Sequence, residues 1–286
     1  MKRHQLFRAV CLLVVILCSS CNFVTHSSSK EVRTAILGAF DEEIVLLKEQ
    51  LKEPREHNFE GITFFTGVLG DRNVVVAEAG VGKVNAAMTA TLLIEHFRPD
   101  EVIFTGIAGS TNPEILPGDI VIGEKSAQHD RGHVMPENFE ARGTINPINK
   151  NRNPIFFPVD EKLLRAAVAA SETVQLEQID TQNGSRQPKT VRGVIVTGDC
   201  FVASNVFRSM LREKFDADAV EMEGAAVAQI CYQQQVPCIV IRSISDSADA
   251  RAAVDLEKFY KTAAKNSATL VAEMVDHLAA KSDAKR

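Results

Sequence analysis

The chain has 286 residues, of which 45% are hydrophobic, 24% charged and 6% aromatic, and its formal net charge is -5 at pH 7. This length and apolar content are enough to bury a large core in one domain, as in an ordinary globular protein. The acidic balance provides no basic surface for a phosphate backbone, so we exclude nucleic acid as a partner and expect a small-molecule ligand.

Residues 1–21 have the pattern of a signal peptide. Three basic side chains, Lys2, Arg3 and Arg8, precede an apolar run, residues 9–17, which is too short to span a bilayer. Small residues stand directly before Cys21, as at a bacterial lipoprotein processing site, although Cys18 occupies the position where leucine is usual. We expect export, lipidation of Cys21 as a membrane anchor at the periplasmic or cell surface, and a polar tether over residues 22–32. An uncleaved anchor is the alternative.

From residue 33 to 282, apolar runs rich in β-branched residues alternate with helical periodicity, which is typical of a layered α/β domain with a mostly parallel sheet. The predicted strands cover residues 34–38, 62–69, 72–78, 101–106, 119–125, 193–197 and 237–244. The predicted helices cover residues 41–52, 84–97, 160–173, 206–215, 224–234 and 255–278. Two polar stretches, residues 128–157 and 174–190, interrupt the pattern and are expected on the surface.

The domain's three cysteines, Cys200, Cys231 and Cys238, are predicted to pack in the core. They are too few for a disulfide framework, although an exported chain could form one bridge. His129 and His133 have helical metal spacing, but they lie in a loop rich in glycine and proline with no third ligand in view. We therefore predict no metal site.

The Gly-Val-Gly-Lys sequence at residues 80–83 is not a phosphate-binding loop, because Ala77 and Val84 stand where glycine and Ser or Thr are required. Asn85 likewise excludes a dinucleotide-binding G-x-G-x-x-G motif. These glycines fit either a strand-to-helix turn or a ligand-facing loop. A second Gly/Ala turn, residues 105–110, follows a strand and lets backbone groups approach a ligand closely.

Two further segments are expected to deliver polar side chains to one rim of the sheet. Val-Glu-Met-Glu-Gly-Ala at residues 220–225 places two carboxylates before a small-residue helix pattern, and a buried carboxylate requires a partner or a function. The next apolar strand begins at Cys238 and leads into Arg242, Ser245 and Asp246. Parallel strands present ligand groups at their carboxyl ends.

Six blocks in the right order give the chain a resemblance to the 5'-methylthioadenosine/S-adenosylhomocysteine nucleosidases, within the purine nucleoside phosphorylase and uridine phosphorylase superfamily. The blocks are Gly-Ala-Phe-Asp-Glu-Glu (38–43), Ala-Gly-Val-Gly-Lys-Val (79–84), Thr-Gly-Ile-Ala-Gly (105–109), Gly-Asp-Cys-Phe-Val (198–202), Val-Glu-Met-Glu-Gly-Ala (220–225) and Arg-Ser-Ile-Ser-Asp-Ser-Ala-Asp (242–249). The resemblance implies a three-layer α/β/α fold of the nucleoside phosphorylase type, with a mixed, mostly parallel twisted sheet. It also implies a homodimer that needs no cofactor and no metal.

The activity that the resemblance implies is hydrolysis of the N-glycosidic bond of methylthioadenosine, S-adenosylhomocysteine or a related adenine nucleoside, with release of adenine. Such a bond breaks through an oxocarbenium-like sugar, so the departing base needs a proton and the attacking water needs a carboxylate. By resemblance, Asp246 is the acid at adenine N7, supported by Ser245. Glu43 is the base that activates water, aided by Arg242.

The same blocks imply the substrate contacts. Glu223 would accept hydrogen bonds from the ribose 2'- and 3'-hydroxyls, with Met222 packed against the sugar. Phe201 would stack on adenine, and the backbone of Val202 would read the edge of the base. The glycine-containing blocks add three further substrate contacts, Val81, Ala108 and Gly109.

Simpler roles exist for some of these residues. Asp246 fits a turn or helix N-cap, and Glu223 and Arg242 fit a structural ion pair. Taken alone, Glu43 is an ordinary helix-start charge. Ile107 stands where the family often has a serine that helps to hold the attacking water, so water placement is expected to differ here.

Two other functions compete with hydrolysis. A phosphorolytic relative would carry arginines at the end of the first strand and just before the Gly/Ala turn, whereas this chain has Glu43 and Phe104 there. Phosphate beside Glu43 without those arginines would be poorly stabilised. A surface-tethered nucleoside-binding or adhesive lipoprotein of the same fold is the second alternative, and the presence of Glu43, Glu223 and Asp246 together argues against it.

Overall fold

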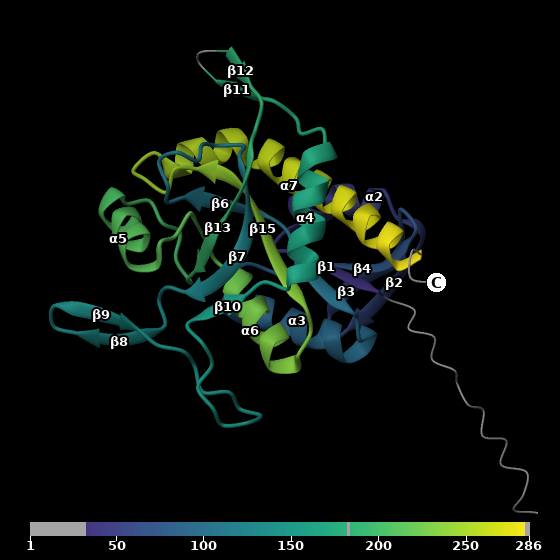
Figure 1. Cartoon of the computed structure of the whole chain (residues 1–286), viewed down its shortest axis with the longest axis horizontal. Coiled ribbons are helices and arrows are strands. Elements are labelled where there is room, and N and C mark those ends of the chain that lie inside the picture. The colour runs from purple at the N-terminus through teal and green to yellow at the C-terminus, as the bar shows by residue number, and fades with distance from the viewer. Residues whose placement is uncertain (1–32, 182–183, 284–286) are drawn as a thin grey trace, which may run out of the picture.

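The structure is a computed structural model that describes residues 33–181 and 184–283. The predicted signal peptide (residues 1–21), its lipidation site Cys21 and the tether (residues 22–32) lie outside the described residues. Helices cover both faces of a central sheet (Figure 1), which confirms the predicted three-layer α/β/α fold. Among the described residues, no helix combines the length and the apolar character needed to cross a membrane.

Within the described ranges, the central sheet has eleven strands in the order β10-β7-β13-β14-β6-β15-β5-β1-β4-β3-β2. Their bounds are β1 Thr34–Gly38, β2 Lys52–Phe59, β3 Ile62–Leu69, β4 Arg72–Glu78, β5 Glu101–Phe104, β6 Ile107–Ser110, β7 Ile120–Gln128, β10 Phe156–Pro158, β13 Thr190–Thr197, β14 Ala219–Glu221 and β15 Cys238–Asp246. β1 runs parallel to β4 and β5, and β15 runs parallel to β5 and β6, so these strands end at one edge. β7 pairs in parallel with β13 and antiparallel with β15, which bends the sheet back on itself.

The helices form two layers around this sheet. α2 (Asp41–Glu49), α4 (Glu161–Thr173) and α7 (Ala252–Asp283) pack together on one face, and α3 (Lys83–Phe97) packs beside α6 (Gly224–Gln234) on the other. α5 (Asn205–Phe215) packs against β13. In β1, Ile36 belongs to the first apolar cluster, whereas Ala35 and Leu37 belong to the second. This alternation follows from the two-residue period of a strand that is buried on both sides.

The two polar stretches contain regular structure. Residues 128–157 include a hairpin of β8 (Gly132–Met135) and β9 (Asn138–Ala141), which projects from the body in Figure 1 and is largely exposed, as predicted. β10 then joins the edge of the central sheet beside β7. The second stretch includes the antiparallel pair β11 (Ile179–Thr181) and β12 (Gly184–Arg186).

The prediction missed short and polar strands. The helix predicted to reach residue 52 ends at Glu49, and Lys52 begins β2, whose charged and exposed residues lack the apolar alternation that marks a half-buried strand. β6 and β14 have four and three residues, too few to show a period. Residues 107–110 were expected as a turn, but they pair with β15 and β14 and extend the sheet beside the site.

Candidate active site

The carboxyl edge of the parallel strands gathers the predicted polar residues. α2 begins three residues after β1 ends at Gly38, and it carries Glu43. β14 ends at Glu221, and β15 ends at Asp246. Because β1, β5 and β15 are neighbouring parallel strands, groups from the two ends of the chain meet at one edge.

Glu43 is a buried carboxylate held by backbone amides. Its Oε1 accepts from the Ile107 amide at 2.8 Å and its Oε2 from the Ala39 amide at 2.5 Å. Burial raises the pKa of Glu43 to about 7, although the charge of Arg242 and the amide hydrogen bonds oppose that rise. A carboxyl group with a pKa near neutrality can accept a proton from water and release it again, as a general base must.

Glu221 and Glu223 lie on either side of Met222 and differ in their partners. Glu223 Oε1 accepts from the Gly82 amide at 2.7 Å. Glu221 accepts from the Thr197 hydroxyl, from the amides of Glu223 and Gly224, and from the Arg242 guanidinium. Burial, followed by the charge of Glu221, raises the pKa of Glu223 to about 8. Glu221 is therefore committed to structure, whereas Glu223 keeps capacity for a ligand.

Arg242 is the guanidinium of this site and is 1% exposed. It forms an ion pair with Glu221 at 2.6 Å, donates to the carbonyls of Phe104 and Ile241, and lies over the Phe104 ring at 4.2 Å. The sequence also fitted a structural ion pair between Arg242 and Glu223. In the structure both residues are buried, but Arg242 pairs with Glu221 instead. Arg242 therefore affects Glu43 through its charge, without a direct hydrogen bond among those found.

Asp246 ends β15 beside the Gly/Ala turn. The Ser245 hydroxyl donates to its Oδ2 at 2.8 Å, and the Ala248 amide donates to its Oδ1 at 2.8 Å. Burial raises the pKa of Asp246, which favours the protonated form. A Cβ at Gly109 would lie 2.8 Å from Asp246 Oδ1, so glycine is required for this close approach. A buried carboxyl group that retains its proton can act as a general acid.

Comparisons with known proteins identify the family of this chain. The family model described as the phosphorylase superfamily matches residues 33–276. A 5'-methylthioadenosine/S-adenosylhomocysteine nucleosidase from Psychromonas ingrahamii is 36% identical over 248 residues, which is 86% of this chain and 100% of the relative. The chain belongs to this nucleosidase family within the phosphorylase superfamily.

Two solved structures extend the comparison. The nucleosidase of Colwellia psychrerythraea in complex with adenine superposes with a TM-score of 0.73 at 33% identity, covering 87% of this chain and 96% of that chain. Futalosine hydrolase of Helicobacter pylori superposes with a TM-score of 0.70 at 32% identity, covering 86% of this chain and 98% of that chain. The superfamily fold around this nucleosidase site therefore occurs with more than one named substrate.

The other predicted contacts of the nucleosidase site differ in their exposure. Phe201 is 49% exposed and Val81 is 51% exposed, so both side chains are partly open to solvent. Met222 is half-buried, and Ala108, Gly109 and Val202 are buried. The sequence analysis assigned no role to Glu221 or Thr197. The signal was present, because each of the two buried carboxylates of the Glu-Met-Glu sequence requires a partner, and Glu221 finds its partners in Arg242 and Thr197.

The histidine pair is separated. His129 is 2% exposed with neither ring nitrogen hydrogen-bonded, whereas His133 lies exposed on β8. Among the residues that the structure describes, no group of three or more His, Cys, Asp and Glu side chains is arranged to hold a metal ion.

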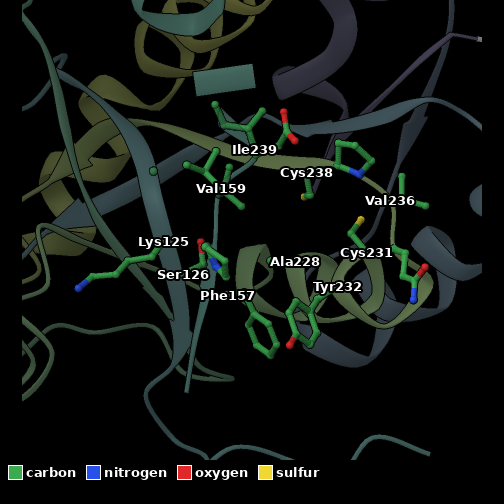
Figure 2. A pocket seen from close by; sticks show the side chains of 16 residues that line it. Lys125, Ser126, Phe157, Val159, Ala228, Cys231, Tyr232, Val236, Cys238 and Ile239 are labelled. Carbon is green, nitrogen blue, oxygen red and sulfur yellow. The ribbon is translucent and has the colours of Figure 1, made fainter. Parts of the chain in front are cut away.

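A separate cavity of about 290 Å³ lies at the opposite end of β15 from Asp246 (Figure 2). It is bordered by β7, β10, the end of α6 and the start of β15, and both Cys231 and Cys238 line it. None of the predicted site residues lines this cavity.

The prediction that all three domain cysteines pack in the core is wrong for Cys200, which is exposed because it lies in the irregular segment between β13 and α5.

Proposed function

We propose that this chain hydrolyses the N-glycosidic bond of methylthioadenosine, S-adenosylhomocysteine or a related adenine nucleoside and releases adenine. The observation that carries the proposal is the meeting of Glu43, Glu223 and Asp246, each at most 5% exposed, at one edge of the sheet in a member of this nucleosidase family. Such burial is costly for a carboxylate without a task.

Asp246 supplies the proton for the departing base. Burial raises its pKa, which favours the protonated form that a general acid needs, and hydrogen bonds from Ser245 and Ala248 hold its two oxygens in place. As the bond to the sugar lengthens, transfer or sharing of this proton stabilises the negative charge that develops on adenine.

Glu43 activates the attacking water. The amides of Ala39 and Ile107 hold its two oxygens, so its position does not depend on the serine hydroxyl that Ile107 replaces. Glu223 accepts from the ribose hydroxyls and Met222 packs against the sugar, while Phe201 stacks on the base. Val202, through its backbone, reads the base edge, and the remaining contacts come from Val81, Ala108 and Gly109.

Hydrolysis is favoured over phosphorolysis by the state of Arg242. All three guanidinium nitrogens donate to protein oxygens, and Glu221 neutralises the charge. Phe104 stacks on this guanidinium and offers no cation of its own. A phosphate ion beside Glu43 would therefore meet a carboxylate and an arginine that is already paired.

The test is release of the free purine base by the chain from residue 22 onward, with and without phosphate. Methylthioadenosine, S-adenosylhomocysteine, adenosine and futalosine are compared, because futalosine hydrolase shares the fold. We expect release without phosphate from a 5'-thio nucleoside, and its loss in Asp246→Asn, which preserves shape while removing the acid. Release only with phosphate would indicate a phosphorylase, and adenine binding without any release would indicate a binding lipoprotein.

We also propose a homodimer. Exposed apolar side chains at the start of α3, Val84 at 79% and Met88 at 51%, occupy one helix face next to Val81 of the site. A second copy that covers this face would remove the apolar surface from water. We expect a dimer by light scattering, and a monomer with weakened substrate binding after Val84→Glu and Met88→Glu.

We also propose that the chain is exported and lipidated at Cys21. A charged start, a short apolar run and small residues before Cys21 support this proposal. Mass spectrometry of the mature protein from a bacterial membrane fraction should find an acylated Cys21 at the N-terminus. A full-length chain that still begins at Met1 would support the uncleaved anchor instead.

A further inference from the structure

Three charged residues outside the catalytic set form a compact cluster next to Gly82, whose amide donates to Glu223. Lys83 Nζ lies 2.6 Å from Asp130 Oδ1 and 3.8 Å from Asp199 Oδ2. Asp130 uses its other oxygen, Oδ2, to accept from the Asp199 amide at 3.0 Å. Asp199 Oδ1 in turn accepts from the Lys83 amide at 2.8 Å. These bonds form a closed ring in which each residue holds the other two.

The ring joins three distant parts of the chain. Lys83 is the first residue of α3, Asp130 follows the end of β7, and Asp199 follows the end of β13. Their side chains are between 18% and 48% exposed, so the ion pairs are partly shielded from water. An ion pair of this exposure adds little to global stability, but it can fix the position of a segment that has few apolar contacts.

Residues 198–204, which we call the base segment, are the part that the ring holds. This segment contains Phe201, whose ring is 49% exposed, so burial alone does not fix the ring. At the segment's start, the buried imidazole of His129 leaves no room for a side chain at Gly198, and the His129 amide donates to the Thr197 carbonyl at 2.9 Å. The start is therefore fixed by packing, and Asp199 is fixed by the ring.

The turn at Gly82 and Lys83 also contacts the residue that is proposed to bind the ribose. The Gly82 amide donates to Glu223 Oε1 at 2.7 Å, and the next amide, that of Lys83, donates to Asp199 Oδ1 at 2.8 Å. Successive amides of one turn thus hold the sugar-binding carboxylate and the base segment at a fixed spacing. A shift at Lys83 would change the distance between the two halves of the nucleoside site.

We propose that Lys83 and Asp130 are positioning residues that hold the base segment in the place where Phe201 meets adenine. The inference rests on the proposed function, because it assigns Phe201 to the base. Neither residue donates to or accepts from Glu43 or Asp246 among the hydrogen bonds found. Removal of either charge should therefore weaken nucleoside and adenine binding and leave the chemical step nearly unchanged.

The test compares Asp130→Asn and Lys83→Met with the wild-type chain. Adenine affinity is measured by calorimetry, and kcat and KM are measured for the nucleoside that is hydrolysed best. Loss of a hydrogen bond to a charged group at a partly exposed site should raise the adenine Kd and the KM by about fivefold to tenfold, with kcat within about twofold. Lys83→Arg should restore most of the affinity, since it keeps the charge.

The matched control is Lys265→Met, which breaks another ion pair of 2.6 Å, with Glu177, on α7. It should leave both constants unchanged. The inference is overturned if Asp130→Asn and Lys83→Met bind adenine as the control does, or if kcat falls as much as KM rises. Phe201→Ala distinguishes failure of the proposed base site from failure of the positioning role. An unchanged adenine Kd in Phe201→Ala would refute the base site. A raised adenine Kd in Phe201→Ala, with no change in the Lys83 and Asp130 variants, would refute only the positioning role.

Discussion

Gly106→Ala is expected to inactivate the enzyme by moving Glu43 without altering it. A Cβ at residue 106 would lie 2.8 Å from Cδ and 2.9 Å from Oε2 of Glu43, whereas ordinary contacts begin at 3.4 Å. The Glu43 carboxyl group must therefore retreat by at least half an ångström or lose its hydrogen bonds to Ala39 and Ile107. Because a displacement of about 1 Å in a catalytic group costs about a hundredfold in rate, kcat should fall by between ten- and a hundredfold.

The assay is steady-state adenine release, together with thermal unfolding of each variant. Gly67→Ala is the matched control, because its Cβ would lie 2.9 Å from the Lys52 carbonyl and 3.2 Å from Leu51, away from Glu43. We expect both variants to unfold at lower temperature and only Gly106→Ala to lose kcat. If Gly106→Ala keeps more than a third of the wild-type kcat, Glu43 is not held in a position that the reaction requires.

Two raised pKa values and one exposed thiol lead to three further predictions. Since burial raises the pKa of Glu43 to about 7, kcat/KM measured across pH should fall by about tenfold per pH unit below that value, as the base becomes protonated. The folded chain holds the Glu223 proton up to about pH 8 and the unfolded chain only to its ordinary 4.5, so the free energy of unfolding should decrease as pH rises between these values, by about 1.4 kcal/mol per unit. Glu223→Gln should remove its own share of this slope in thermal unfolding, leaving the share that Glu43 contributes below about pH 7, and should raise the melting temperature at pH 8.5 while its KM increases. Under native conditions, mass spectrometry after maleimide treatment should find Cys200 modified before the buried Cys231, and adenine should slow the reaction because Cys200 adjoins Phe201.

The sequence predicted the fold through its long apolar elements. Residues 34–38 and 237–244 are buried runs bounded by glycine, proline or charge, and they correspond to β1 and β15. Helix 224–234 was predicted at its observed bounds, because its small apolar residues begin after a charged pair and its pattern stops at Gln234. By contrast, β2 is polar and lies at an edge, so its pairing with β3, and not its composition, makes it a strand.

The sequence predicted a set of site residues, but it did not predict which glutamate pairs with Arg242. The six blocks predict Glu43, Glu223 and Asp246 as site residues, and the parallel sheet brings all three to one edge. The choice of Glu221 over Glu223 as the partner of Arg242 depends on which side chain faces β13, where the Thr197 hydroxyl also binds Glu221. No local pattern encodes that direction, because both glutamates flank the same methionine.

The charges that remain after this pairing match the chemistry of a glycosidic bond. Glu221 neutralises Arg242, so the described residues of the site leave three carboxyl groups, Glu43, Glu223 and Asp246, around the space where the nucleoside would lie. Burial raises the pKa of each of these groups, so part of this charge is offset by bound protons at Glu43 and Glu223 near neutral pH. In the proposed reaction, Asp246 passes its proton to the departing adenine, Glu43 takes a proton from the attacking water, and the carboxylate charge of the site stabilises the positive charge that develops on the ribose. The same excess of negative charge repels phosphate, so an oxocarbenium-like sugar is stabilised here and captured by water.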